Sequence, residues 1–177
     1  MAEKPVRKLS ILALLASLAL SASALTVGIA PAEGATYAPP PMGRGSPMGY
    51  LVSGCLDTLF EAGYIATDCA VSWTPHDSWG LADYGLAEAK DGSVNYVIAV
   101  FVEWASSSFR KNILLPASVD FRLMRVLDGK VLAEGSVRGP SDSEITSSHE
   151  SRTAAQAGAS AVEPCVKMLS TLAKGGE

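Results

Sequence analysis

Residues 94–104 read VNYVIAVFVEW, and this stretch decides the fold. The run from Val97 to Val102 is apolar at every position and leaves no polar face. We therefore expect a strand that is covered on both sides, at the centre of a sheet. A strand of this kind needs neighbouring strands on both edges and helices on both faces, which the rest of the chain has to supply.

Upstream of this stretch the chain offers two strand patterns and two helix patterns. The apolar positions of residues 48–62 recur at spacings of three and four, which is typical of a helix with one buried face. Ser46 and Pro47 are start signals for this helix, and Gly63 is a stop signal. The residues expected on its buried face are Leu51, Val52, Cys55, Leu56, Leu59 and Phe60. We also expect a buried strand over 25–30 that is closed by Pro31, a half-buried strand over 64–73, and a second helix that runs from a cap at Asp77 or Ser78 to Lys90.

Downstream, two alternating segments are followed by an alanine-rich one. Residues 117–127 alternate between apolar and polar, and Asp128-Gly129 predicts a two-residue hairpin turn into a strand over 130–137. Residues 150–173 predict a helix that Pro164 kinks or splits. The element order predicts a single α/β domain, with a mixed β-sheet of about five strands packed with about three helices.

The first 24 residues have the organisation of a secretory signal peptide. Three basic residues between positions 4 and 8 precede an uncharged apolar core over 9–20, and Ala22-Ser23-Ala24 is a small-residue cleavage site. Cleavage there would leave residues 25–177 as a periplasmic or secreted protein without membrane attachment, since no lipid-accepting Cys follows the core. The alternative is an uncleaved anchor, because no charge occurs between Lys8 and Glu33.

Export changes what is expected of Cys55, Cys69 and Cys165, because an oxidising compartment favours disulfides. Three cysteines predict one disulfide and one free thiol. The equal alternative is that all three are small buried hydrophobic residues. No C-x-x-C pair is present, so we predict no redox motif, no metal site and no cofactor.

Two segments are candidates for binding a protein partner. Residues 33–49 form a proline- and glycine-rich loop whose length is typical of a loop with a function. A turn over residues 73–79 carries aromatic side chains of the kind that anchor partners, although burial of the tryptophans in the core is the alternative. The candidate contact residues are Pro39, Pro40, Pro41, Arg44, Trp73, His76 and Trp79. We therefore predict an exported, non-catalytic accessory module of the cell envelope that binds a protein partner.

Two other function classes stay open. The glycines of residues 43–49 precede a helix, so this segment could bind a small molecule or an anion, although it matches no phosphate-loop pattern. Cys69 and His76 could form a Cys/His enzyme site, although a His in a proline-containing turn is usually a solvated residue.

Composition and motifs exclude several other classes. Fourteen basic and eighteen acidic residues give a formal charge of −4 with no basic patch, which argues against a nucleic-acid partner. The chain has no G-x-S-x-G and no H-E-x-x-H motif, so we predict no catalytic residue.

Several short phrases, together with the element order, resemble a group of bacterial envelope domains. The phrases are LTVGIAP at 25–31, GYI at 63–65, AEAKDGSVNYVI at 87–98 and LDGKVL at 127–132. The group comprises the amino-terminal domain of TolB, the curli secretion lipoprotein CsgG and the penicillin-binding-protein activator LpoB. The resemblance implies the α/β fold and an envelope role. The chain has no lipid-bearing Cys and no propeller, so a membrane tether or a pore is not implied.

Overall fold

Five strands form one mixed sheet in a computed structural model that describes residues 25–34, 46–69, 80–106, 114–139 and 150–174. The strand order is β2-β1-β3-β4-β5; β1 is parallel to both neighbours, and the β3–β4 and β4–β5 pairs are antiparallel. The strands are β1 (Thr26–Glu33), β2 (Ile65–Asp68), β3 (Tyr96–Ser106), β4 (Leu114–Arg125) and β5 (Val131–Arg138). The predicted class, a single α/β domain with a five-stranded mixed sheet and three helices, is confirmed.

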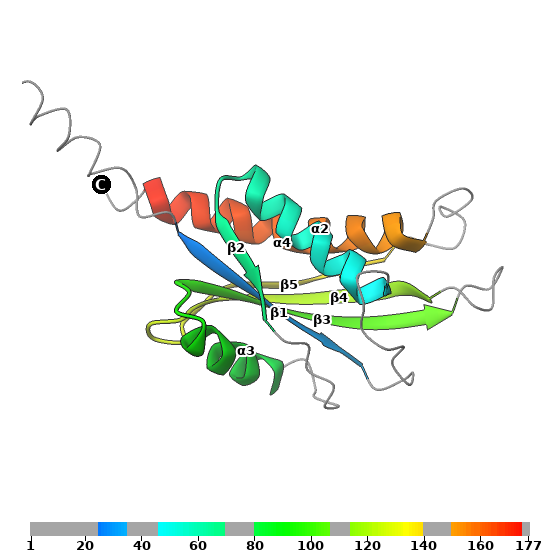
Figure 1. The fold of residues 1–177 in the computed structure, drawn as a ribbon, viewed down its shortest axis with the longest axis horizontal. Coiled ribbons are helices and arrows are strands. Elements are labelled where there is room, and N and C mark those ends of the chain that lie inside the picture. Colours follow the sequence, from blue (N-terminus) through cyan, green and yellow to red (C-terminus); the bar gives the residue numbers. More distant parts are fainter. Residues whose placement is uncertain (1–24, 35–45, 70–79, 107–113, 140–149, 175–177) are drawn as a thin grey trace, which may run out of the picture.

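The helices cover both faces of the sheet (Figure 1). One face carries α2 (Pro47–Glu61) and α4 (Glu150–Lys174), which pack on each other, and the other face carries α3 (Gly80–Asp91). Strand β3 lies in the middle, with Ile98 and Val100 in the core under α2 and α4 and with Val97 and Ala99 in the core under α3. The apolar run of residues 97–102 is therefore the central covered strand that the sequence predicts.

Helix α2 begins and ends at the predicted signals. The Ser46 hydroxyl caps it by accepting a hydrogen bond of 3.0 Å from the Gly49 amide, and Gly63 follows it in the left-handed region with a φ of +86°. The prediction that Phe60 is buried was wrong, because 53% of its surface is exposed while Leu59 is fully buried. One residue rotates a helix by about 100°, which turns Phe60 away from the core.

Strand β1 was predicted to stop at Pro31, but it continues to Glu33. The odd-numbered residues of β1 direct their backbone groups toward β2, as the hydrogen bond from the Cys69 amide to the Ile29 carbonyl shows. Strand β2 ends opposite Ile29, so Pro31 has no ladder partner on that side and its missing N–H breaks no hydrogen bond.

Two predictions for the part of the chain before α3 need correction. In the half-buried strand predicted over 64–73, Ile65 alternates with Ala66 and belongs to the buried side. This placement was wrong, since Ile65 is 53% exposed at the edge of the sheet and Ala66 is partly buried. The loop predicted over 33–49 is shorter at both ends, because Glu33 belongs to β1 and Pro47 begins α2.

The second half of the chain departs from two local predictions. The β4–β5 connection is longer than a two-residue turn: the Arg125 amide donates to the Lys130 carbonyl, and Val126 between them is buried in the core under α3. Pro164 does not split α4, which is one helix of 25 residues. Pro164 and Ser160 lie on its exposed side, where water can satisfy the carbonyl that the proline leaves without an amide partner.

Candidate functional site

The sheet gives the domain two distinct ends. At the amino end, β1, β2 and β3 begin, α2 and α4 terminate, and the β4–β5 hairpin turns. At the carboxyl end, β1 and β3 terminate and α2 and α4 begin. In open α/β sheets, ligands commonly bind beyond the carboxyl ends of parallel strands, which makes this end a candidate for a binding site.

The residues predicted to contact a partner lie outside the described residues. Pro39, Pro40, Pro41 and Arg44 fall within 35–45, and Trp73, His76 and Trp79 fall within 70–79. The residues that flank these segments are described. The Gly34 amide donates to the Val102 carbonyl at 3.0 Å, and the Cys69 amide donates to the Ile29 carbonyl at 2.7 Å. The two segments therefore leave the sheet from neighbouring parallel strands, β1 and β2.

A carboxylate and an indole meet where β1 and β3 terminate. Trp104 is 8% exposed and lies in the core, and its indole N–H donates to the Glu33 carboxylate. Burial raises the pKa of Glu33, and the hydrogen bond from Trp104 partly opposes this shift. This pair was not predicted from the sequence, because Glu33 was expected to lie in a loop. A carboxylate directly after a buried strand was the available signal.

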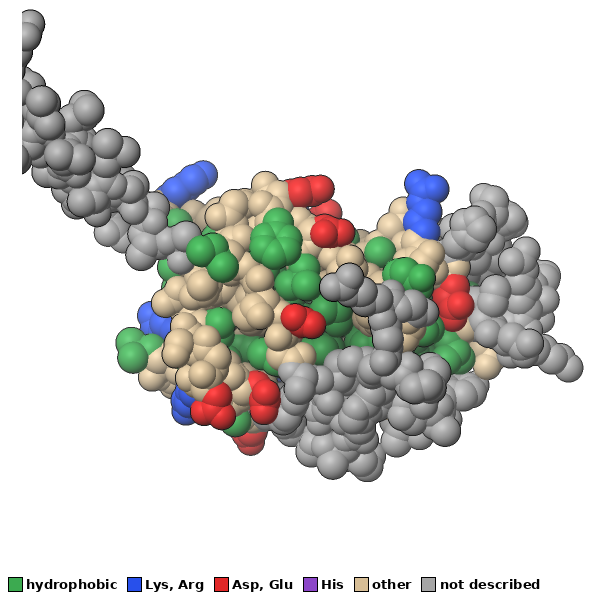
Figure 2. Space-filling view, in the orientation of Figure 1, with side chains coloured by type: hydrophobic (Ala, Val, Ile, Leu, Met, Phe, Trp, Pro, Cys, Tyr) green, Lys and Arg blue, Asp and Glu red, His purple; other side chains and the backbone are tan. Residues whose placement is uncertain are grey.

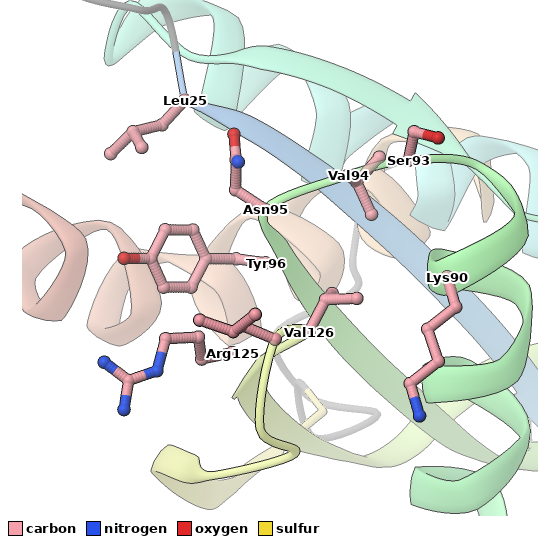
Figure 3. Close-up of a pocket in the computed structure, with 9 residues that line it drawn as sticks. Leu25, Lys90, Ser93, Val94, Asn95, Tyr96, Arg125 and Val126 are labelled. Atoms are coloured by element: carbon pink, nitrogen blue, oxygen red, sulfur yellow. The ribbon is translucent and has the colours of Figure 1, made fainter.

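The amino end contains an open pocket of about 560 Å³ (Figure 3). In Figure 3, Tyr96 and Arg125 project in the same direction from adjacent strands, and Lys90 projects from the last turn of α3 on the other side of the pocket. The lining residues are Leu25, Lys90, Ser93, Val94, Asn95, Tyr96, Arg125, Val126 and Leu127. The residues of this pocket come from four separate places in the chain and form no local motif, so the sequence alone does not predict it.

Asn95 holds three strand ends together beside this pocket. Its side-chain oxygen accepts hydrogen bonds from the amide and the hydroxyl of Thr26, at 2.9 and 2.8 Å. Its own backbone amide donates to the Thr26 carbonyl, and its carbonyl accepts from the Val126 amide, each at 3.0 Å. The start of β1, the start of β3 and the end of β4 are thereby fixed relative to one another.

The guanidinium in the pocket is already engaged. Arg125 and Asp128 form an ion pair of 2.6 Å within the hairpin, and a hydrogen bond from the Lys130 amide also reaches the Asp128 carboxylate. These interactions, led by the hydrogen bond from Arg125, lower the pKa of Asp128 to about 2. The charge on Arg125 is consequently balanced within its own hairpin.

The three cysteines are free thiols that lie in two different layers. Cys55 and Cys165 are buried together in the core between α2, α4 and the sheet, where burial raises the pKa of each to about 12. Cys69 is half-buried against the core on the opposite face. The predicted disulfide remains a prediction, and this arrangement leaves Cys55–Cys165 as the pairing it would use.

The two alternative function classes gain no support from the described residues. Burial, reinforced by the nearby charges of Glu88 and Asp68, raises the pKa of Cys69, which is the opposite of what an activated nucleophile needs. At the start of α2, the Ser46 hydroxyl already uses the Gly49 amide that an anion would require. Across residues 25–34, 46–69, 80–106, 114–139 and 150–174, no cluster of His, Cys, Asp and Glu has the makings of a metal site, and no helix is long and apolar enough to span a membrane.

No protein-family model matches the chain, and no curated protein matches it. Among solved structures, a single-site variant of the PelC dodecamer from Paraburkholderia phytofirmans is similar, with 19% identity, a TM-score of 0.50, and coverage of 79% of this chain and 86% of PelC. TolB from Acinetobacter baumannii is 14% identical at a TM-score of 0.46, covering 84% of this chain and 29% of TolB. The carboxy-terminal domain of LpoB from Salmonella enterica is 14% identical at a TM-score of 0.35, covering 71% of this chain and 93% of that domain. The predicted resemblance to the TolB and LpoB group is thus confirmed, and at these identities it is a similarity of fold.

Proposed function

We propose that this protein is an exported, non-catalytic accessory module of the bacterial envelope that binds a protein partner at its carboxyl end. The contacts would come from residues 35–45 and from the turn over 73–79. The observation that carries the proposal is the departure of both segments from the adjacent parallel strands β1 and β2. Two segments that were predicted separately to contact a partner thus follow neighbouring strands.

Export is supported by the amino-terminal sequence, in which a basic start, an uncharged apolar core and Ala22-Ser23-Ala24 follow one another. The raised pKa of the Cys69 thiol argues against the alternative of a Cys/His enzyme site. A partner surface on loops that a rigid sheet positions is the usual way in which such folds acquire a function.

Site-specific photocrosslinking in the envelope tests this proposal. A photoreactive residue is placed in turn at Pro40, Arg44, Trp73 and Trp79, and at Glu134, an exposed control position on β5. We expect a discrete crosslinked species from the first four positions and none from Glu134. Equal crosslinking at the control position, or no crosslinking from either segment, would reject the carboxyl end as the partner site.

A loop replacement separates binding from folding. Exchanging residues 35–45 for a Gly-Ser linker of the same length should remove the crosslink at Trp79 and leave the unfolding transition in place, because β1 and α2 keep all their residues. The assembly size of the unmodified protein is measured in the same samples. PelC forms a dodecamer, and a crosslinked species that contains only this chain would identify another copy as the partner.

A further inference from the structure

Large hydrophobic side chains gather at the amino end. Among the described residues, five large hydrophobic side chains are exposed, and all five lie at this end. Each sits at the boundary of an element: the last turn of α2, the start of β2, the β4–β5 hairpin, the start of β5 or the last turn of α4. They are Phe60 (53% exposed), Ile65 (53%), Leu127 (90%), Val131 (40%) and Leu172 (38%). Because they come from separate elements, the amphipathic pattern of one helix or strand does not explain their grouping.

The chain enters the domain at this same end. Leu25 lines the pocket of Figure 3, and β1 begins at Thr26. The sequence immediately before it, residues 9–24, contains no charged side chain. Only Leu25 lies between this segment and Thr26, and the Cα atoms of residues 24 and 26 can be at most about 7 Å apart. No linker therefore separates the domain from residues 9–24. Whenever residues 9–24 sit in a bilayer, the amino end is held directly against the lipid.

Basic and acidic side chains both lie near the exposed apolar ones. Lys90, Lys130 and Lys174 are exposed at the ends of α3, the hairpin and α4, and Figure 2 shows Lys and Arg side chains among hydrophobic ones at this end of the molecule. Glu61, Asp91 and Asp128 are acidic residues at the same end, and Asp128 is paired with Arg125. Apolar contact is therefore the main attraction, and the lysines add a preference for anionic headgroups.

We propose that the amino end is a surface that contacts an anionic phospholipid bilayer. Leu127, Phe60 and Ile65 enter the region between headgroups and acyl chains, and Lys90, Lys130 and Lys174 meet the phosphates. The carboxyl end then points away from the membrane. This inference is independent of the proposed partner site, because it rests on the other end of the sheet.

A polarity-sensitive fluorophore tests the contact directly. The full chain is expressed with its own amino-terminal segment, and the exported product carries the probe at Leu127→Cys or, as a matched control at the carboxyl end, at Ala105→Cys, which is exposed at the end of β3. Both are made with Cys69→Ser, so that the half-buried native thiol is not labelled. Vesicles contain phosphatidylethanolamine and phosphatidylglycerol, with or without a lipid-borne quencher, and phosphatidylcholine vesicles serve for comparison.

We expect the probe at position 127 to shift to the blue and to lose at least half of its emission to the quencher, while the probe at position 105 changes by less than a tenth. Weaker quenching in phosphatidylcholine, and weaker quenching when Phe60→Asp is added, would support the assignment. The readout is local to each probe, so it holds whether or not residues 1–24 have been cleaved. No quenching at position 127, equal quenching at both positions, or a probe that responds only to self-association or to an added protein would overturn the proposal.

Discussion

Gly54 of α2 lies against the backbone carbonyl of Ala155 on α4, and the two helices leave no room for a side chain between them. Gly158 of α4 lies in the same way against the Leu51 carbonyl of α2. A hydrogen bond of 3.4 Å from the Cys55 thiol to the Gly158 carbonyl crosses the same contact. The two glycines thus set how closely α2 and α4 approach, and with that the depth of the main core.

Replacing Gly54 with Ala should destabilise the domain strongly. A Cβ at this position overlaps the Ala155 carbonyl, and overpacking of a core costs about 1–3 kcal/mol even where neighbours can shift. We expect a loss of at least about 2 kcal/mol in the free energy of unfolding, measured by urea denaturation. Gly92→Ala is the control, because its nearest new contact is 3.4 Å away. Similar urea midpoints for the two variants would contradict the close approach.

The Arg125–Asp128 pair predicts a pH dependence. The folded-state pKa of Asp128 is about 2, below its ordinary value, so the pair stabilises the fold above the ordinary carboxyl pKa and loses this contribution as the pH falls through about 2. In Arg125→Gln, the carboxyl pKa followed by NMR should rise toward about 4. An unchanged titration of Asp128 in the variant would show that the ion pair does not form in solution.

Thiol labelling should distinguish Cys69 from the other two cysteines. In the folded protein at pH 8, we expect alkylation at Cys69 alone, because Cys55 and Cys165 are buried and the pKa of each is raised to about 12. Peptide mass mapping identifies the labelled site. Under oxidising conditions, a disulfide that includes Cys69 would contradict the placement of the cysteines on opposite faces of the sheet.

Ser93 offers a stabilising substitution. It has a φ of +54° just after α3, a left-handed conformation that costs a side-chain-bearing residue about 1 kcal/mol or more. Ser93→Gly should therefore raise the free energy of unfolding by about 0.5–1 kcal/mol, seen as a higher melting temperature. Ser93→Ala keeps the Cβ and should bring no such gain; equal stabilisation by both would assign the effect to the lost hydroxyl.

Regular patterns in the sequence predicted the framework of the fold, whereas its edges and ends needed the structure. The run over 97–102 and the helix between Pro47 and Gly63 were predictable because burial on both faces or on one face leaves a period in the sequence. Ile65 and Phe60 were assigned wrongly because such a period does not tell where an element leaves the core. The amino-end pocket was not predictable, since Lys90, Asn95 and Arg125 meet only once the strands are paired.

The packing of α4 on α2 has a consequence for the order in which the chain folds. Helix α4 is the last described element, and it completes the main core with Ala154, Ala157, Ala161, Val162, Cys165 and Leu169. If the chain crosses a membrane with its amino terminus first, the core cannot close until α4 has crossed. Until then, α2 and the face of the sheet that α2 and α4 cover keep their apolar side chains exposed. If the chain is exported, this topology would delay closure of the main core until α4 has crossed the membrane.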